Sequence, residues 1–76
     1  MTDIELITPI DVMQKTAQRA KALRLAQNIT QQELADKVGV SRPMIGQIER
    51  GSRVPSVVLG RDIAKALGVS VEDLLK

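Results

Sequence analysis

The sequence predicts an all-α fold of five helices on the strength of two observations. First, five residues favour a helix N-cap: Thr8, Thr30, Ser41, Ser56 and Ser70. Each is followed by a stretch whose apolar residues recur every three or four positions, which is the period of an α-helix. Second, most of these stretches are followed by a residue that tolerates the left-handed conformation in which helices often end: Asn28, Gly39, Gly51 and Gly68. The connections are short, as expected of one small domain.

The first helix is expected from Pro9 to about Gln27. Thr8 would cap it, and Pro9 suits the first helical position, where a missing N–H is tolerated. Its apolar residues fall on one face and are interpreted as core packing: Met13, Ala17, Ala20 and Leu23. Residues 1–8 would form an N-terminal arm, with alternating polar and apolar positions that leave open a short strand, an arm or a disordered leader.

Two short helices are expected next, at about 31–37 and 42–50. Thr30 and Glu33 have the spacing of a capping box. Gly39 would end the first of these helices and permit a tight turn, so the two helices should cross steeply, as in a helix-turn-helix. Ala35 is small enough to let Ile45 approach at the crossing.

The fourth helix is expected from the cap Ser56 to about Leu67, and the fifth covers the stretch V-E-D-L-L at 71–75. The inward side chains of the fourth helix would be Leu59, Ile63, Ala66 and Leu67. Gly60 is unusual within this helix, because glycine in a helix interior costs ~1 kcal/mol relative to alanine.

Composition removes several classes of function. The 76 residues include no Cys and no His, which excludes disulfides, thiolate zinc sites and the usual neutral-pH proton carrier. An enzyme is therefore not expected, and neither a cofactor nor a metal. No apolar run approaches the ~20 residues of a membrane span, and Asp3 and Glu5 occupy an N-terminus without a basic signal region, so a cytoplasmic protein is expected.

Positive charge is concentrated in the middle of the chain. Residues 19–53 hold seven bases against three acids, whereas residues 1–18 hold one base against three acids. Charge alone is compatible with an ordinary solvated surface, but a basic segment that coincides with the predicted helix-turn-helix favours a nucleic-acid contact.

The segment from Thr30 to Gly51 resembles the helix-turn-helix of the phage repressor and Cro-like (Xre-type) family of bacterial transcription regulators. The matching residues are Leu34, Ala35, Val38, Gly39, Val40, Ile45, Ile48, Glu49, Arg50 and Gly51, with further matches at Pro55, Ser56 and 63–70. The resemblance covers about residues 19–75. It implies a lambda-repressor-like DNA-binding domain over residues 9–76, with the helix-turn-helix formed by the second and third helices.

The resemblance also implies a set of DNA contacts. The third helix would lie in the major groove, with base contacts from Arg42, Pro43, Met44 and Gln47. Arg42 would form bidentate hydrogen bonds with guanine, and Gln47 would do so with adenine. Met44 and Pro43 would touch a thymine methyl, although helix initiation alone also explains Pro43 and an ordinary exposed position explains Gln47. Phosphate contacts are expected from Thr30, Gln31, Ser41, Arg50, Ser52 and Arg53.

Arg24 and Glu49 are interpreted as a partly buried structural ion pair, by analogy with an Arg and a Glu at matching positions in similar proteins. A homodimer on a near-palindromic operator is expected, because one reading helix makes few base contacts. The implied dimer surface is Val69, Val71, Leu74 and Leu75, with burial in the core as the equal alternative.

The expected function is a sequence-specific regulator of double-stranded DNA, most simply a repressor. A phage-type repressor, a restriction–modification controller and an antitoxin all fit, with a toxin or antirepressor as a possible protein partner. The alternative is a protein-interaction module or an antitoxin that keeps the fold but mainly binds another protein.

The fourth helix and the arm depart from the family pattern. Gly60 stands where a large aliphatic residue is usual, and Val58 and Leu59 are apolar where polar residues are common. Gly46 within the third helix is also costly, which suggests a close approach to the backbone there. Our hypothesis is that Ile4, Leu6 and Ile7 pack near the fourth helix or contribute to a dimer contact.

Overall fold

The computed structural model describes the backbone of residues 9–75 and the side chains of residues 15–74. All five elements in this part of the chain are helices: α1 (Pro9–Ala26), α2 (Gln31–Val38), α3 (Arg42–Glu49), α4 (Val57–Ala66) and α5 (Val71–Leu75). The predicted all-α, five-helix fold is confirmed, with helix ends that differ from expectation by about one residue. The predicted arm at 1–8 and the side chains of Met13 and Leu75 lie outside the described residues.

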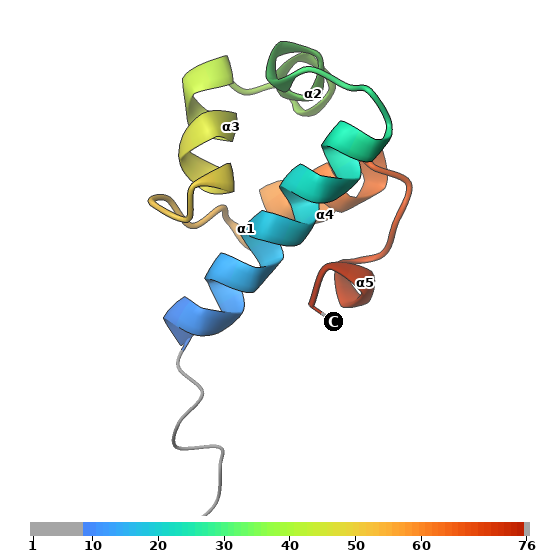
Figure 1. The fold of residues 1–76 in the computed structure, drawn as a ribbon. Helices are drawn as coiled ribbons and strands as arrows, with labels where there is room; N and C mark the ends of the chain where they lie inside the picture. Colours follow the sequence, from blue (N-terminus) through green and yellow to red (C-terminus); the bar gives the residue numbers. More distant parts are fainter. Residues whose placement is uncertain (1–8, 76) are drawn as a thin grey trace, which may run out of the picture.

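The long helix α1 runs across the molecule, and the other helices are arranged around its C-terminal half (Figure 1). The short helices α2 and α3 lie at one end, while α4 lies behind α1 and leads into α5 (Figure 1). The first turns of α1 extend beyond α3 and α4 in this view. The helix-turn-helix is therefore carried at one end of a frame built from α1, α4 and α5.

Helix ends are set by local side-chain chemistry. The Thr30 Oγ1 accepts a 3.0 Å hydrogen bond from the Glu33 N–H, and the Glu33 carboxylate accepts one of 3.0 Å from the Thr30 N–H, which confirms the capping box. The hydroxyls of Ser41 and Ser56 cap α3 and α4 in the same sense. Gly39 has a φ of +75°, so the turn between α2 and α3 uses the left-handed conformation.

The core is aliphatic and joins all five helices. Ala35 is fully buried and Ile45 is 1 % exposed, as expected where α2 meets α3. Ala64 is also buried, a position that the sequence prediction did not include, whereas the predicted Ala66 is only half-buried. The remaining buried apolar residues of this core are Ala20, Leu34, Ile48, Ile63, Leu67 and Leu74.

The end of α1 is joined to the end of α4. Gln27, predicted as the last helical residue, lies one residue beyond α1, and its Nε2 donates a 2.7 Å hydrogen bond to the Leu67 carbonyl. Asn28 follows with a φ of 58°, which confirms it as the left-handed residue after α1. Ile29 then packs against the core, also as predicted.

Candidate nucleic-acid interface

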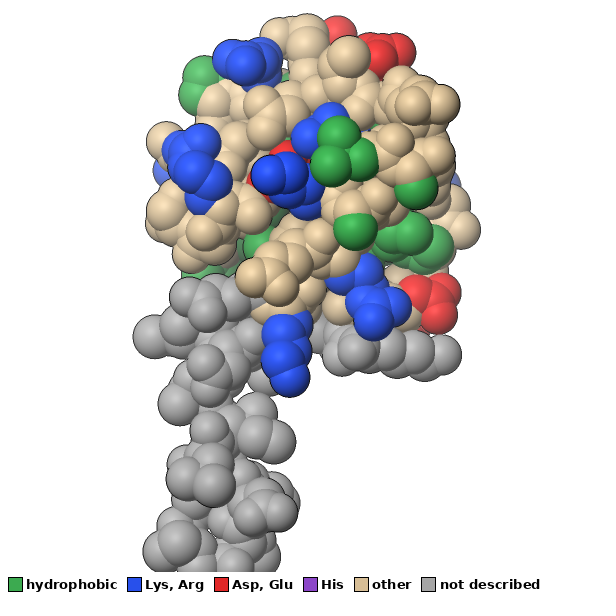
Figure 2. Space-filling model, viewed as in Figure 1, with side chains coloured by type: hydrophobic (Ala, Val, Ile, Leu, Met, Phe, Trp, Pro, Cys, Tyr) green, Lys and Arg blue, Asp and Glu red, His purple; other side chains and the backbone are tan. Residues whose placement is uncertain are grey.

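Helix α3 has one face in the core and the other in solvent. Ile45 and Ile48 are buried, whereas Arg42 and Pro43 at its start are exposed. Gln47 is half-buried, and Met44 is half-buried against the core, so only part of the Met44 side chain is available to a base. Basic side chains lie over α3 and along α1 on the face shown in Figure 2.

A buried charged network fixes α3 against α1. The Arg24 Nε donates to Glu49 Oε2 at 2.6 Å, and Arg24 Nη2 donates to Glu49 Oε1 at 3.1 Å. The two side chains are 7 % and 3 % exposed, respectively. Bidentate geometry is the strongest form of an arginine–carboxylate contact. The predicted structural ion pair is therefore present, and it is more deeply buried than expected.

The same network reaches the start of α2. Arg24 Nη1 donates to the Ile29 carbonyl at 2.6 Å, and the Gln31 Nε2 donates to Glu49 Oε1 at 3.1 Å. Among the described residues, every buried side-chain nitrogen and oxygen has a hydrogen-bond partner. The network thus ties together the end of α1, the start of α2 and the end of α3, a link that spacing in the sequence does not reveal.

Gly46 explains how this arrangement fits. A Cβ at Gly46 would lie 3.3 Å from Arg50 Nη1 and 3.8 Å from Gln31 Nε2. Both side chains therefore lie over the backbone of α3 at the one buried glycine of that helix. The close approach suggested by the sequence is made by these two polar side chains.

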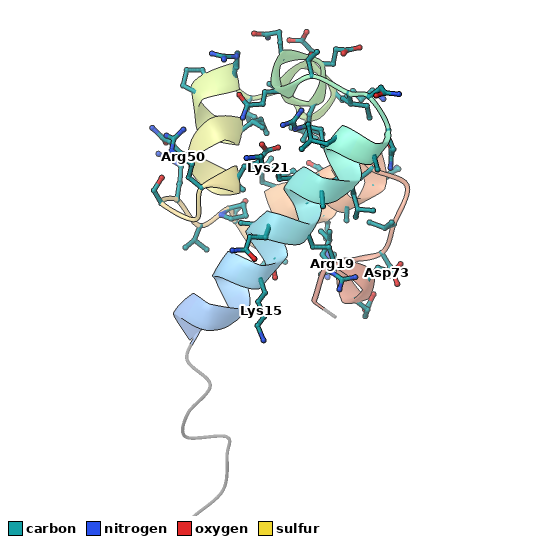
Figure 3. All side chains as sticks on the ribbon, in the orientation of Figure 1. Lys15, Arg19, Lys21, Arg50 and Asp73 are labelled. Carbon is teal, nitrogen blue, oxygen red and sulfur yellow. The ribbon has the colours of Figure 1, made fainter. Side chains whose placement is uncertain are left out.

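The predicted phosphate contacts fall into two groups. Arg50 and Arg53 have exposed side chains, and the Arg50 side chain is seen near the C-terminal end of α3 in Figure 3. The other four also serve the fold: Thr30, Gln31 and Ser41 make the bonds given above, and the Ser52 Oγ donates to the Gln47 carbonyl at 3.1 Å. Because one of the two N–H groups of the Gln31 amide donates to Glu49, a phosphate there would meet the α2 N-terminus and at most one amide N–H.

The capping box has an electrostatic consequence at the start of α2. The pKa of Glu33 is held below its usual value of 4.5, chiefly by the hydrogen bond from the Thr30 N–H and next by the Thr30 side chain. Lys37 lowers this pKa further, and partial desolvation opposes the shift. Glu33 is therefore an ionised cap at neutral pH.

The predicted dimer residues are largely occupied within the chain. Leu74 is only 4 % exposed, so its side chain belongs to the core and is not available to a partner. Val69 and Val71 are half-buried against the same core. The exposed large apolar residues lie elsewhere, at Leu25, Val54, Val57 and Val58, and the last two are 73 % and 67 % exposed. The apolar character of Val58, at a position where polar residues are common, is a sequence signal for the exposed surface at Val57 and Val58.

Metal-ligand clusters and membrane-spanning helices are both absent from the described residues. These residues contain no group of three acidic, His or Cys side chains placed to hold a metal ion. None of the helices they form is both long enough and apolar enough to cross a membrane.

Comparison with known proteins identifies the family. The profile of the helix-turn-helix family HTH_3 matches residues 21–74. An HTH-type transcriptional regulator of Methanocaldococcus jannaschii is 46 % identical over 56 residues, which cover 74 % of this chain and 85 % of the relative. The Bacillus subtilis HTH-type regulator YazB is 38 % identical over 56 residues, covering 74 % of this chain and 81 % of YazB.

Solved structures agree. The restriction–modification controller protein C.AhdI of Aeromonas hydrophila has a TM-score of 0.77 and 36 % identity, over 84 % of this chain and 96 % of C.AhdI. The clp gene regulator ClgR of Corynebacterium glutamicum has a TM-score of 0.81 and 30 % identity, over 84 % of this chain and 68 % of that one. The chain belongs to the Cro/Xre-like helix-turn-helix family of DNA-binding transcription regulators, with a lambda-repressor-like fold.

Proposed function

We propose that this helix-turn-helix regulator is a cytoplasmic repressor that binds a near-palindromic operator as a homodimer, with α3 in the major groove. The observation that carries the proposal is the division of α3 into a buried face locked to α1 and an outer face that presents Arg42 and Gln47. A reading helix must be held in one orientation for its side chains to discriminate bases, and the Arg24–Glu49 pair supplies that restraint.

Each polar residue has a separate role in this proposal. Arg42 at the start of α3 would pair with guanine O6 and N7, and Gln47 with adenine N6 and N7. Arg50 and Arg53 would hold phosphates beyond the groove, and the N-terminus of α2 at Gln31 would hold another. Half-sites would lie one helical turn apart, ~34 Å, to suit a two-fold dimer.

A second candidate function rests on the exposed apolar surface. Val57 and Val58 on α4 are largely exposed, and they lie on a different helix from the proposed DNA contacts. A protein partner such as a toxin or an antirepressor would use this surface, and the chain would then act mainly as an interaction module. The basic residues flanking α3 favour DNA binding as the primary function.

The test is selection of binding sites from a random duplex pool, followed by fluorescence anisotropy of the selected duplex at two salt concentrations. Enrichment of a near-palindrome bound by two protomers is expected. Enrichment of a single half-site bound by one protomer would contradict the dimer, and weak binding without enrichment would contradict the specific regulator.

Two substitutions separate base reading from phosphate binding. Arg42→Ala should relax the preference at one base position per half-site, with a loss of ~1–3 kcal/mol for the preferred base. Arg53→Ala should weaken binding to all sequences alike and reduce the slope of log K against log salt by about one per contact. Lys65→Ala, which removes an exposed base from α4, is the matched control and should change neither quantity.

A further inference from the structure

A groove lies on the side of the molecule formed by α1, α4, α5 and the loop before α4. Its volume is about 660 Å³, and its described apolar walls include Ala17, Ala20, Ile48, Val57, Val69 and Leu74. Val57 is 73 % exposed, and a Cβ placed on Gly60, another lining residue, would meet nothing within 4 Å. An apolar hollow beside a largely exposed valine is a surface that an apolar group of a partner would fit.

Helix α4 has two neighbouring edges that differ in character. Residues four positions apart stack on the same side of a helix, so Val57 and Arg61 form one edge, and Val58 and Asp62 form the next. Val57 and Arg61 line the groove, whereas Val58 and Asp62 do not. All four side chains are exposed. The groove edge is therefore apolar and basic, and the outer edge is apolar and acidic.

The charges of the two edges are not neutralised within the described part of the chain. Neither Arg61 nor Asp62 makes an ion pair with another described residue. The two are consecutive in sequence, and side chains one position apart on a helix do not face each other. The outer edge of a second copy would supply both the apolar group and the carboxylate that the groove edge lacks. One helix thus carries a surface and its complement.

A two-fold axis along α4 brings the complementary edges together. When two α4 helices lie side by side and parallel, residues with neighbouring numbers lie at nearly the same height, as in a parallel coiled coil. The rotation places the outer edge of each helix beside the groove edge of the other, so each contact forms twice. Val58 of one chain then meets Val57 of the second copy, and Asp62 meets Arg61.

We propose that the chain dimerises by parallel packing of α4 against α4 of a second copy, with Val58 on Val57 and Asp62 on Arg61. The valines supply the affinity, and the exposed ion pairs set the register while adding little stability. The proposal rests on the homodimer of the proposed function and names its surface. This surface differs from the one implied by resemblance, of which Leu74 belongs to the core.

Sedimentation equilibrium without DNA tests the apolar contact. The parent chain should form a dimer, and Val58→Ser should raise its dissociation constant roughly 10- to 100-fold, because two valine contacts are lost per dimer. Leu25→Ser is the matched control, since Leu25 is 54 % exposed but lies on α1. It should leave the dissociation constant unchanged.

Charge reversal tests the register on the same instrument. Arg61→Asp places two carboxylates at each paired position and Asp62→Arg places two guanidiniums there, so each variant should dimerise roughly tenfold more weakly than the parent chain. The exchanged variant, Arg61→Asp with Asp62→Arg, has the composition of the parent and should regain the dimer. A mixture of the two single variants should form a heterodimer, because opposite charges then meet at both positions.

Three outcomes overturn the proposal. A dimer that Val58→Ser does not weaken uses another surface, and an exchanged variant that stays as weak as the single variants excludes this register. A parent chain that remains monomeric at the highest concentration excludes the dimer in free solution and leaves the exposed surface at Val57 and Val58 to a different protein. Selection of binding sites reports DNA recognition separately, so a specific regulator with another dimer surface is distinguished from a chain that is no regulator.

Discussion

The two ends of this small domain differ in how completely their side chains are packed. Where α2 meets α3, Ala35 is fully buried, and Arg24 and Glu49 are paired with every buried polar side-chain atom satisfied. Where α4 meets α1 and α5, a groove of about 660 Å³ remains open and Val57 is largely exposed. The first end is complete within the described residues, and the second has a surface suited to a further contact.

The difference separates orientation from stability. A buried ion pair adds little net stability compared with apolar residues of similar volume, because both charges must leave water. Its bidentate geometry and the added bonds to Ile29 and Gln31 instead restrain how α1, α2 and α3 are arranged. We infer that the α2–α3 end is built for a fixed direction of α3.

The largest expected effect is at the packed end. Glu49→Ala should lower the free energy of unfolding by about 3–5 kcal/mol, because it leaves the Arg24 guanidinium buried with only the Ile29 carbonyl as a described partner. Urea denaturation followed by circular dichroism measures the change. Asp62→Ala removes an exposed acid from α4 and should have little effect, so equal losses from the two variants would contradict this account.

A smaller loss of stability is expected from placing a larger side chain at the tightly packed crossing of α2 and α3. Ala35→Leu should cost about 1–3 kcal/mol, since the added atoms must enter the crossing of α2 and α3 where Ala35 has no exposed surface. Ala22→Leu makes the same change at an exposed position of α1 and serves as the control. If both variants denature at the same urea concentration, the crossing is not tightly packed.

At the end where α4 meets α1 and α5, a substitution is expected to raise the free energy of unfolding. Gly60→Ala should raise the free energy of unfolding by up to about 1 kcal/mol, because it adds helix propensity and its Cβ meets nothing within 4 Å. Gly46→Ala should gain less, because its Cβ would lie 3.3 Å from Arg50 Nη1. Thermal and urea denaturation of both variants measure the two changes, and equal gains would show that the side chains over Gly46 impose no cost.

The smallest expected effect is the pH dependence of the α2 cap. Because folding lowers the pKa of Glu33, its contribution to stability is present above the ordinary value of 4.5 and is lost as pH falls through the lower folded value. Glu33→Gln should therefore be less stable than the parent chain at neutral pH, with the difference closing in acid. A difference in urea midpoint that stays constant with pH would mean that the charge of Glu33 does not contribute.

Sequence reasoning located the helices well for a physical reason. Thr30, Ser41 and Ser56 each cap a helix through a hydroxyl that reaches an N–H three residues on, which is local chemistry that the order of residues determines. Gly39 marks the turn for an equally local reason, its positive φ. Local rules of this kind fixed the helix ends to about one residue.

Less of the candidate nucleic-acid interface could be predicted from the sequence. The Arg24–Glu49 pair joins residues 25 positions apart in the chain and was expected only from resemblance. The bonds from Arg24 to Ile29 and from Gln31 to Glu49, which join residues 5 and 18 positions apart, were not predicted. The groove depends on the summed volumes of side chains from three helices. Gly60 pointed to it, but a single glycine does not reveal how the surrounding helices close over it. The base and phosphate contacts stay predictions.

The separation of the two faces of α3 bears on how such a regulator changes over generations. The residues that hold the helix in place, Ile45, Ile48 and Glu49, are buried, whereas Arg42 and Pro43 are exposed and none of the buried network's hydrogen bonds involves them. If Arg42 reads a base as proposed, a codon change at position 42 would alter what the protein recognises while leaving the buried network intact. Duplicated copies of the gene would then diverge to new operators through very few mutations.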